Sequence, residues 1–264
     1  MIDTHCHLTF PEFAGKIDRT MADAAAAGVD GVITISTTIP DARAALAVAR
    51  AHPRVWCTAG VHPGYSDRAP HHWAELGEVI AHPRCVAWGE LGLDNHYPEP
   101  APSVQRRVLD EQLAFICAAR ERGIDKPIVL HCREASDDLI PVLRSTGIPG
   151  ERFVFHCFTG GPADMARVLE LGAMASFTGV VTYPNAPEVR KAFTMMPADR
   201  YMVETDAPFL SPAPKRGVRP CVPAFARLTA EALAAHAGVP WPEFHRRINQ
   251  NTRRFFGVNS ETDQ

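Results

Sequence analysis

The sequence predicts an α/β protein, specifically a TIM-like (β/α)₈ barrel, and three observations support this prediction. Eight short apolar segments alternate with longer segments of helical character along the chain. Most of the short segments are apolar throughout, which is typical of parallel strands that are covered on both faces. The length of 264 residues is close to that of a typical barrel of this type. We therefore expect residues 1–264 to form a single barrel domain.

The expected strands cover residues 1–5, 31–36, 55–61, 85–91, 127–131, 153–158, 172–177 and 201–206. Helices are expected between them, most clearly over residues 40–51 and 104–122. In the second of these, Val104, Val108 and Phe115 fall close to one helical face. Pro53 and Pro83 each mark the change from a helix to the next strand, because proline ends a helix at or before the preceding residue. An open doubly wound sheet is the alternative, since alternation of strands and helices does not by itself close a sheet.

The longest irregular segments, residues 92–103 and 207–223, each come directly after an expected strand. In a barrel, loops that follow the strands lie over the active-site face. We therefore expect these two segments to border the functional site.

The composition excludes several classes of protein. With 46% hydrophobic residues the chain can bury a large core, and no apolar run approaches the ~18 residues of a membrane-spanning helix. The first residues lack the basic and apolar regions of a signal peptide. The seven cysteines form no CxxC pair, which favours reduced thiols and a cytoplasmic protein. The net charge of −3 excludes a broad basic surface, so phosphate contacts would need a local basic patch.

The first expected strand runs into the segment Asp3-Thr4-His5-Cys6-His7. Alternate residues of a strand point to the same side, so His5 and His7 would present two imidazoles in one direction. Imidazole is a good ligand for zinc, manganese, nickel and iron. Taken alone, this pair fits a metal site and two structural histidines about equally well.

Four further strand ends carry side chains of the same kind: Glu90, His131, His156 and Asp206. Ionisable groups that follow buried apolar residues are costly to bury without a partner, and in a barrel the carboxyl ends of the strands converge on one axis. Together with the first pair, these residues supply more ligands than one zinc ion with an open position needs. The set suits two divalent cations bridged by a carboxylate.

Six short motifs follow one another along the chain: DTHCH (3–7), GVHP (60–63), GELGLD (89–94), HCREA (131–135), HCFTG (156–160) and ETDAP (204–208). In this order and spacing they resemble the TatD family of metal-dependent deoxyribonucleases, over essentially the whole chain. The resemblance implies a TIM-like barrel of the amidohydrolase superfamily with its metal site at the C-terminal face of the strands. It also implies 3′–5′ exonuclease activity on DNA with magnesium, manganese or zinc.

The resemblance further implies roles for individual residues. One metal ion would be held by His5, His7, Glu90 and Asp206, and the second by Glu90, His131 and His156, with Glu90 bridging the two.

Residues around the metal ions also receive roles from this resemblance. His62 would lie near the substrate phosphate, and Arg133 would contact phosphate or pair with a neighbouring carboxylate. Glu204 stands two residues before Asp206, so we expect it on the same strand face, where it would position a water molecule or a metal ligand.

The segment after Pro208 departs from the family pattern, which usually has Arg-Gly-Lys-Arg-Asn-Glu-Pro character here. Val218 replaces a usual lysine, and Pro220-Cys221 replace asparagine and glutamate. The remaining cations, Lys215, Arg216 and Arg219, are enough for a local phosphate clamp. The change leaves the preferred substrate and its length open.

Two further expectations concern neighbours of the motifs. Asn95-His96 stands where the family commonly has aromatic residues, so base stacking at this point would be weaker. Cys6, Cys132 and Cys157 each flank a proposed ligand. Neighbouring residues of a strand point to opposite sides, so we expect these cysteines to be packed and inert.

The residues predict hydrolysis of a phosphodiester by a hydroxide held between two divalent cations, with Asp206 as general base. The resemblance implies DNA as the substrate, as single strands or 3′ ends. The alternative is hydrolysis of an ester or amide, as in a lactone or a D-aminoacyl-tRNA. Many dinuclear amidohydrolases have a carboxylated lysine where this chain has Glu90, which favours the phosphodiester. A third alternative is a metal-binding, non-enzymatic protein of export or quality control, but no docking helix, charged tail or other sign of a protein or membrane partner is present.

Overall fold

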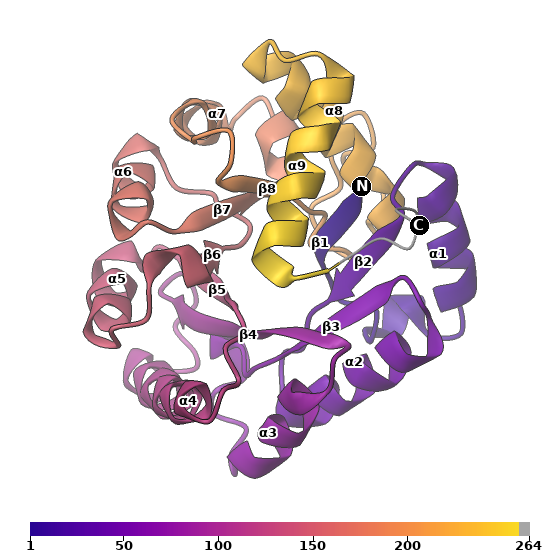
Figure 1. Ribbon diagram of the computed structural model, residues 1–264. Helices are drawn as coiled ribbons and strands as arrows, with labels where there is room; N and C mark the ends of the chain where they lie inside the picture. The colour runs from indigo at the N-terminus through magenta and orange to yellow at the C-terminus, as the bar shows by residue number, and fades with distance from the viewer. Residues whose placement is uncertain (259–264) are drawn as a thin grey trace.

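The structure, a computed structural model, describes residues 1–258. Within them, eight parallel strands form one sheet in chain order. The strands are β1 (Ile2–Cys6), β2 (Gly31–Thr34), β3 (Val55–Ala59), β4 (Cys85–Asp94), β5 (Ile128–Arg133), β6 (Phe153–Phe155), β7 (Met174–Phe177) and β8 (Tyr201–Val203). A parallel bridge between Cys6 and Ala207 joins the first strand to the segment after the last strand. This bridge closes the sheet, so the predicted barrel is confirmed and the open sheet is excluded (Figure 1).

Helices surround the barrel (Figure 1). They are α1 (Ile17–Ala26), α2 (Ile39–Ala51), α3 (Trp73–Ala81), α4 (Pro102–Glu121), α5 (Ser136–Ser145), α6 (Pro162–Leu171), α7 (Pro187–Thr194), α8 (Ala226–Ala237) and α9 (Trp241–Phe256). Short 3₁₀ helices lie in the connections, at Pro11–Phe13, Pro63–Tyr65, Gly150–Arg152, Gly179–Thr182 and Pro223–Phe225. None of the helices in residues 1–258 combines the length and apolarity that crossing a membrane requires.

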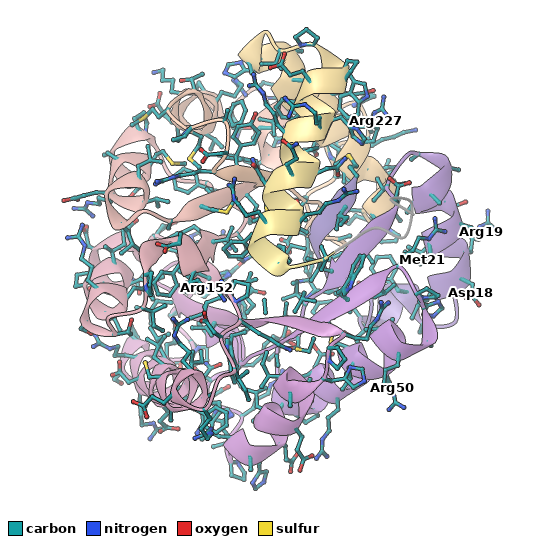
Figure 2. All side chains as sticks on the ribbon, viewed as in Figure 1. Asp18, Arg19, Met21, Arg50, Arg152 and Arg227 are labelled. Atoms are coloured by element: carbon teal, nitrogen blue, oxygen red, sulfur yellow. The ribbon has the colours of Figure 1, made fainter. Side chains whose placement is uncertain are left out.

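The core has two parts, as expected for a sheet with a buried inner and outer face. The larger part fills the space between the strands and the surrounding helices. The smaller part fills the barrel, where residues near the start of the strands, such as Ile2 and Met174, pack with Phe255 and Phe256 of α9. Charged side chains such as Asp18, Arg19 and Arg50 point outward from the helical ring (Figure 2). Because α9 covers one end of the barrel, the opposite end, where the strands finish, is free to carry a site.

Several strand boundaries differ from the sequence-based ranges. β4 continues to Asp94, so the irregular segment before α4 is shorter than expected. β6 stops at Phe155 and β8 at Val203, so His156 and Asp206 follow strands rather than end them. Burial on both faces gives these segments continuous apolar runs, and such runs do not mark where the backbone hydrogen bonding stops.

Candidate metal centre

The six residues expected to bind metal lie together at the carboxyl ends of the strands. A cavity of about 1050 Å³ opens above them. Its wall includes His7, Glu90, His131, His156 and Asp206. His5 is fully buried directly beneath the others, and its ring stacks on that of His156 with 3.9 Å between the ring centres. Residues that are up to 201 positions apart in the sequence thus form one cluster of nitrogen and oxygen donors.

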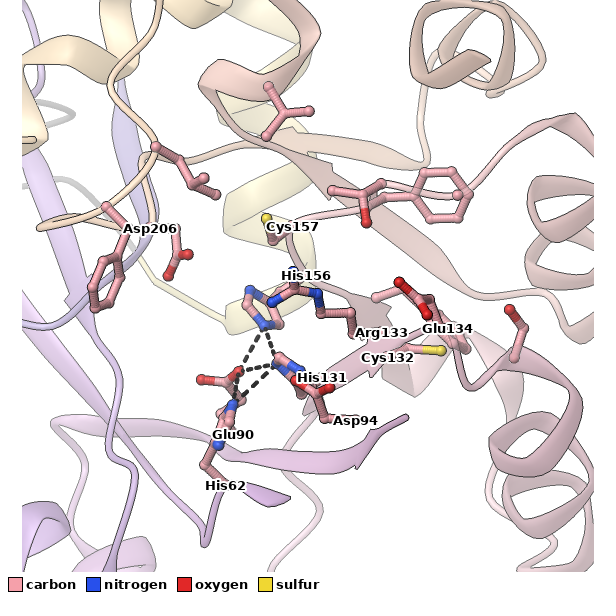
Figure 3. A pocket seen from close by; sticks show the side chains of 18 of the residues that line it. His62, Glu90, Asp94, His131, Cys132, Arg133, Glu134, His156, Cys157 and Asp206 are labelled. Carbon is pink, nitrogen blue, oxygen red and sulfur yellow. Dashed lines mark hydrogen bonds and ion pairs between the residues drawn. The ribbon is translucent and has the colours of Figure 1, made fainter. Parts of the chain in front are cut away.

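Glu90 lies at the centre of this cluster (Figure 3). Its Oε1 atom is 2.6 Å from His156 Nε2 and 2.8 Å from His131 Nδ1. Its Oε2 atom points the other way and is 3.4 Å from His5 Nε2. The two oxygens of one carboxylate therefore face two different groups of imidazoles, which is the geometry of a bridging ligand.

Asp206 completes the group on the His5 side. Its Oδ1 atom is 3.4 Å from His7 Nε2 and 3.6 Å from His5 Nε2. The His7 ring is oriented from behind, because its Nδ1 lies 3.1 Å from the carbonyl oxygen of Ile35. A carbonyl only accepts, so Nδ1 of His7 carries a proton, and Nε2 is the ring nitrogen that faces Asp206.

The backbone explains how Glu90 and Asp206 reach this position. Between Trp88 and Leu91, β4 has one residue more than the facing part of β5, and such a bulge re-aims a side chain. Asp206 has a φ of +58°, a left-handed conformation that aspartate tolerates better than most residues. Its amide donates to the carbonyl of His5 at 2.8 Å, so the turn is tied to the end of β1.

The electrostatics of the cluster favour anionic carboxylates. Burial alone would raise the pKa of Glu90, but the surrounding imidazoles, His156 foremost, bring that pKa well below its usual value. The pKa of Asp206 is also lowered, because its hydrogen bond with His7 and the charges of His5 and His7 outweigh its burial. Both side chains are therefore available as anionic metal ligands at neutral pH.

Unpartnered polar atoms test whether these residues fit a metal ion. Within residues 1–258, His5 Nδ1 and Nε2, His156 Nδ1 and Glu90 Oε2 are buried without a hydrogen bond. Buried polar atoms are normally hydrogen-bonded, and an orphaned carboxylate oxygen that faces an orphaned imidazole nitrogen needs another partner. Ligand atoms of His5, His7 and Asp206 lie within 4.8 Å of one another, and the same holds for two further groups, His5, His156 and Glu204, and His62, Glu90 and His131. Imidazole nitrogens and carboxylate oxygens of this kind suit a divalent cation.

His62 has a different orientation from the other histidines. Its Nδ1 accepts the backbone N–H of Gly64 at 2.8 Å, and therefore the proton is on Nε2. That Nε2 lies 3.5 Å from Glu90 Oε1 and 3.2 Å from His131 Nδ1. Burial lowers the pKa of His62 to about 3, so the ring is neutral. His62 thus offers an N–H donor to the cavity.

Glu204 lies behind the cluster and does not share a face with Asp206. Its Oε1 accepts the amide of Cys157 at 2.6 Å and is 3.5 Å from His156 Nδ1, and its side chain is only 1% exposed. The expectation of a common face was wrong, because β8 ends at Val203 and strand alternation does not extend past it. Asp206 lines the cavity, whereas Glu204 contacts the rear of His156.

The expectation of a packed, inert thiol holds for Cys6, which is fully buried in the core, and for Cys132, which packs against that core. Cys132 and Cys157 line the cavity. Alternation does not apply to Cys157, whose φ is +44°. Burial raises the pKa of Cys132 to about 12 and that of Cys157 well above its ordinary value, so both remain protonated thiols and poor metal ligands.

The cavity wall includes two of the four cations expected to bind substrate. Arg133 and Arg219 line it, whereas the exposed Lys215 and Arg216 do not. Arg133 lies over the ring of Tyr97 at 5.0 Å, and within residues 1–258 it makes no ion pair with a carboxylate. Arg216 instead lies over the ring of Tyr183 at 4.4 Å. The segment after Pro208 therefore brings one positive charge to the cavity itself.

Three residues without an assigned role from the sequence belong to the site. Tyr97 and Phe209 are 55% and 40% exposed and line the cavity, so the loop at Asn95-His96 carries an aromatic ring after all, one residue later than the family pattern suggests. Asp94 is buried beside His131. The rule that identified Glu90, an acidic residue after an apolar strand, also applied to Asp94 and could have found it.

Comparison with known proteins agrees with this geometry. A family model described as "TatD related DNase" matches residues 2–257. The chain belongs to the TatD family. The predicted resemblance is thereby confirmed, and it covers nearly the whole chain.

Relatives of the TatD family are similar over their full length. The "3'-5' ssDNA/RNA exonuclease TatD" of Enterobacter lignolyticus is 35% identical, with 98% of this chain and 99% of the relative covered. The "Uncharacterized metal-dependent hydrolase TatD" of Mycobacterium tuberculosis is also 35% identical, with 98% of each covered. The crystal structure of YjjV, a TatD homologue from Escherichia coli K12, superposes with a TM-score of 0.90 at 30% identity over 98% of both chains. The protein is accordingly a metal-dependent hydrolase with the TIM-barrel fold of its family.

Proposed function

We propose that this TatD-family hydrolase is a 3′–5′ exodeoxyribonuclease that cleaves phosphodiester bonds at the ends of single-stranded DNA. The observation that carries the proposal is a cluster of four imidazoles and two carboxylates at the floor of a cavity whose wall holds Arg133 and Arg219. Guanidinium groups pair well with phosphate oxygens. The similarity to a relative named as an ssDNA/RNA exonuclease supports the same substrate class.

The proposed centre takes two divalent cations, Mg²⁺, Mn²⁺ or Zn²⁺. One group of ligands is His5, His7, Glu90 and Asp206, and the other is Glu90, His131 and His156. When bound, a pair of divalent cations lowers the pKa of water and offsets negative charge on a phosphate. Glu90 belongs to both groups because its two oxygens face opposite sides of the cluster.

The chain's own side chains then have distinct tasks. Asp206 is a carboxylate at the cavity wall and accepts the proton of the attacking water as general base. His62 donates its Nε2 proton in a hydrogen bond to a non-bridging phosphate oxygen. Glu204 orients His156 from behind and does not touch substrate. Lys215 and Arg216, which lie outside the cavity wall, would contact phosphates farther along the strand.

Exposed aromatic rings at the cavity favour a nucleic-acid substrate whose bases are unpaired. Phe209 packs edge-on against Phe10 with 6.1 Å between ring centres, and Tyr97 lies against Arg133 on another part of the wall. Unpaired bases stack on exposed aromatic rings, whereas the bases of a duplex are already stacked on each other. The proposed substrate is therefore a single strand or a frayed 3′ end.

The test compares wild-type protein with Asp206→Asn and Glu90→Gln on a single-stranded DNA labelled at its 3′ end, with bound metal measured for each. We expect Asp206→Asn to bind metal but to lose about 100- to 10,000-fold in kcat, the usual contribution of a general base. Glu90→Gln should lose metal as well as activity. Asp110→Asn, on the outer face of α4, is the matched control and should behave as wild type. Full metal-dependent activity of either site variant would refute these roles.

A substrate panel separates this proposal from ester or amide hydrolysis. Single-stranded DNA, duplex DNA, RNA, a D-aminoacyl-tRNA and simple lactones are each assayed with Mg²⁺, Mn²⁺ and Zn²⁺. Turnover of the tRNA ester or of a lactone, without release of nucleotides from DNA, would replace the nuclease proposal with that of a deacylase or lactonase.

We further propose that the protein acts in the cytoplasm and needs no protein partner for catalysis. All seven of its cysteines are free thiols, and several of them are buried in the core, which suits a reducing compartment. Fractionation of cells with an antibody against the protein tests the location.

A further inference from the structure

Asp94 contacts the far side of a proposed metal ligand. It is the last residue of β4, and only 4% of its surface is exposed. Its Oδ2 atom is 3.0 Å from His131 Nε2 (Figure 3). The other ring nitrogen, His131 Nδ1, faces Glu90 Oε1 at 2.8 Å and His156 Nε2 at 3.2 Å. The imidazole is thus held between two carboxylates, one inside the cluster and one outside it.

We infer that Asp94 is the positioning residue that makes Nδ1, and not Nε2, the metal-binding atom of His131. A carboxylate only accepts hydrogen bonds, so contact with Asp94 places a proton on Nε2. Glu90, on the other side of the ring, is itself a proposed ligand, so with a cation bound Nδ1 would carry no proton and its lone pair would be directed at the centre. A carboxylate behind a ligating imidazole also increases its basicity. This inference rests on the proposed role of His131 as a metal ligand.

Three other histidines of the cluster differ in the group that lies behind the ring. The carbonyl of Ile35 accepts from His7 Nδ1 at 3.1 Å, and the carboxylate of Glu204 faces His156 Nδ1 at 3.5 Å without a hydrogen bond. Behind His62 there is a donor, the N–H of Gly64. Asp94 thus corresponds to the acceptor behind His7, and not to the donor behind His62.

Asp94 is itself held rigidly and links His131 to the cavity wall. Its Oδ1 atom accepts the backbone N–H groups of His96 at 2.9 Å and Tyr97 at 3.4 Å. Its own backbone N–H and C=O groups are both bonded to the buried side chain of Gln105 at 2.9 Å. One carboxylate thus fixes a proposed metal ligand and the loop that carries the exposed Tyr97 ring.

The test titrates metal-free wild-type, Asp94→Asn and Asp41→Asn proteins with Mn²⁺ by calorimetry. Asparagine has one acceptor oxygen, so it can serve His131 or the backbone N–H groups of the loop, but not both. We expect Asp94→Asn to weaken Mn²⁺ binding about 10- to 100-fold, as is typical when the group behind a ligating histidine is changed. Asp41 also accepts a backbone N–H, from Thr37 at 2.8 Å, but within residues 1–258 it forms no hydrogen bond or ion pair with an imidazole, so Asp41→Asn should bind Mn²⁺ as wild type does.

A second measurement does not depend on the folding of a variant. In wild-type protein loaded with Zn²⁺, ¹⁵N spectra of the histidines should show His131 with its proton on Nε2, assigned by the loss of that signal in His131→Gln. Wild-type Mn²⁺ affinity of folded Asp94→Asn, or a proton on Nδ1 of His131, would overturn the inference. Weakened Mn²⁺ binding by Asp94→Asn, in a protein that cleaves no phosphodiester, would support the role of Asp94 and refute the proposed nuclease.

Discussion

Replacing Asp3 with asparagine should make the metal-free protein more stable at high pH. Asp3 is fully buried below the metal centre. Its carboxyl accepts the hydroxyl of Thr205 at 2.6 Å and the amides of Thr205 and His5 at 2.9 and 3.3 Å. Burial nevertheless raises its pKa from 3.8 to about 8, because these three hydrogen bonds offset only part of the cost of burying the charge.

The sign and size of the effect follow from this raised pKa. The unfolded chain releases the proton above about pH 4, whereas the folded protein holds it until about pH 8. The contribution of Asp3 to wild-type stability is therefore complete below pH 4 and is lost as the pH rises toward 8. Each pH unit in this window costs the wild type about 1.4 kcal/mol, or on the order of 6 kcal/mol in total. Asparagine mimics the protonated carboxyl and does not titrate.

The assay is urea unfolding of both proteins at pH 5, 6, 7 and 8, followed by circular dichroism with a chelator present. The free energy of unfolding of Asp3→Asn, minus that of wild type, should increase steadily with pH and level off near pH 8. The measurement at pH 5 is the internal reference, because strain introduced by the amide would shift all four values equally. A difference that stays constant from pH 5 to 8 would refute the reasoning, since it would mean that Asp3 is ionised in the folded protein.

Three further predictions concern the site. A Cβ at Gly92 would lie 1.9 Å from the backbone oxygen of His131. The substitution Gly92→Ala should therefore displace this proposed ligand and abolish tight Mn²⁺ binding in calorimetry. Unchanged binding would contradict the packing of β4 on β5. Phe209→Ala should raise KM for single-stranded DNA about 5- to 150-fold with little change in kcat, since a stacked base contributes about 1–3 kcal/mol. The control Met195→Ala removes a side chain of similar exposure, 39%, outside the cavity wall and should leave KM unchanged. A chelator should lower Tm, and Mn²⁺ at 100 times its Kd should restore about 2.7 kcal/mol of stability; an unchanged Tm would contradict a bound metal.

The fold could be predicted from the sequence because its signals are local. Continuous apolar segments and intervening helices specify parallel strands buried on both faces, and a barrel brings their ends to one axis. The identity of the candidate ligands followed from this, since His5 and His131 stand near the ends of their strands, Asp206 lies just beyond one, and Glu90 directly follows an apolar run within β4. The predicted positions of the strand ends were less accurate, because backbone pairing of a strand stops where its partner strand stops, and the sequence does not show that point.

Side-chain direction beyond the strands could not be predicted in this way. Asp206 and Cys157 have positive φ values of 58° and 44°, so the alternation of a strand does not tell which way they or their neighbours point. This is why Glu204 was expected beside Asp206 and Cys157 was expected in the core. Likewise, charge alone did not distinguish Arg219, which lines the cavity, from Arg216, which lies over Tyr183.

The sequence by itself determined the alternation of strands and helices, the chemical types of the donors and the family, because each depends on residue identity and spacing along one chain. Only the tertiary structure decided which nitrogen of each histidine faces the centre. The choice depends on the group behind the ring: Asp94 behind His131, the Ile35 carbonyl behind His7, and the Gly64 amide behind His62. These contacts join residues brought together by folding, and a hydrogen bond, which has a direction, assigns the proton where composition and spacing cannot.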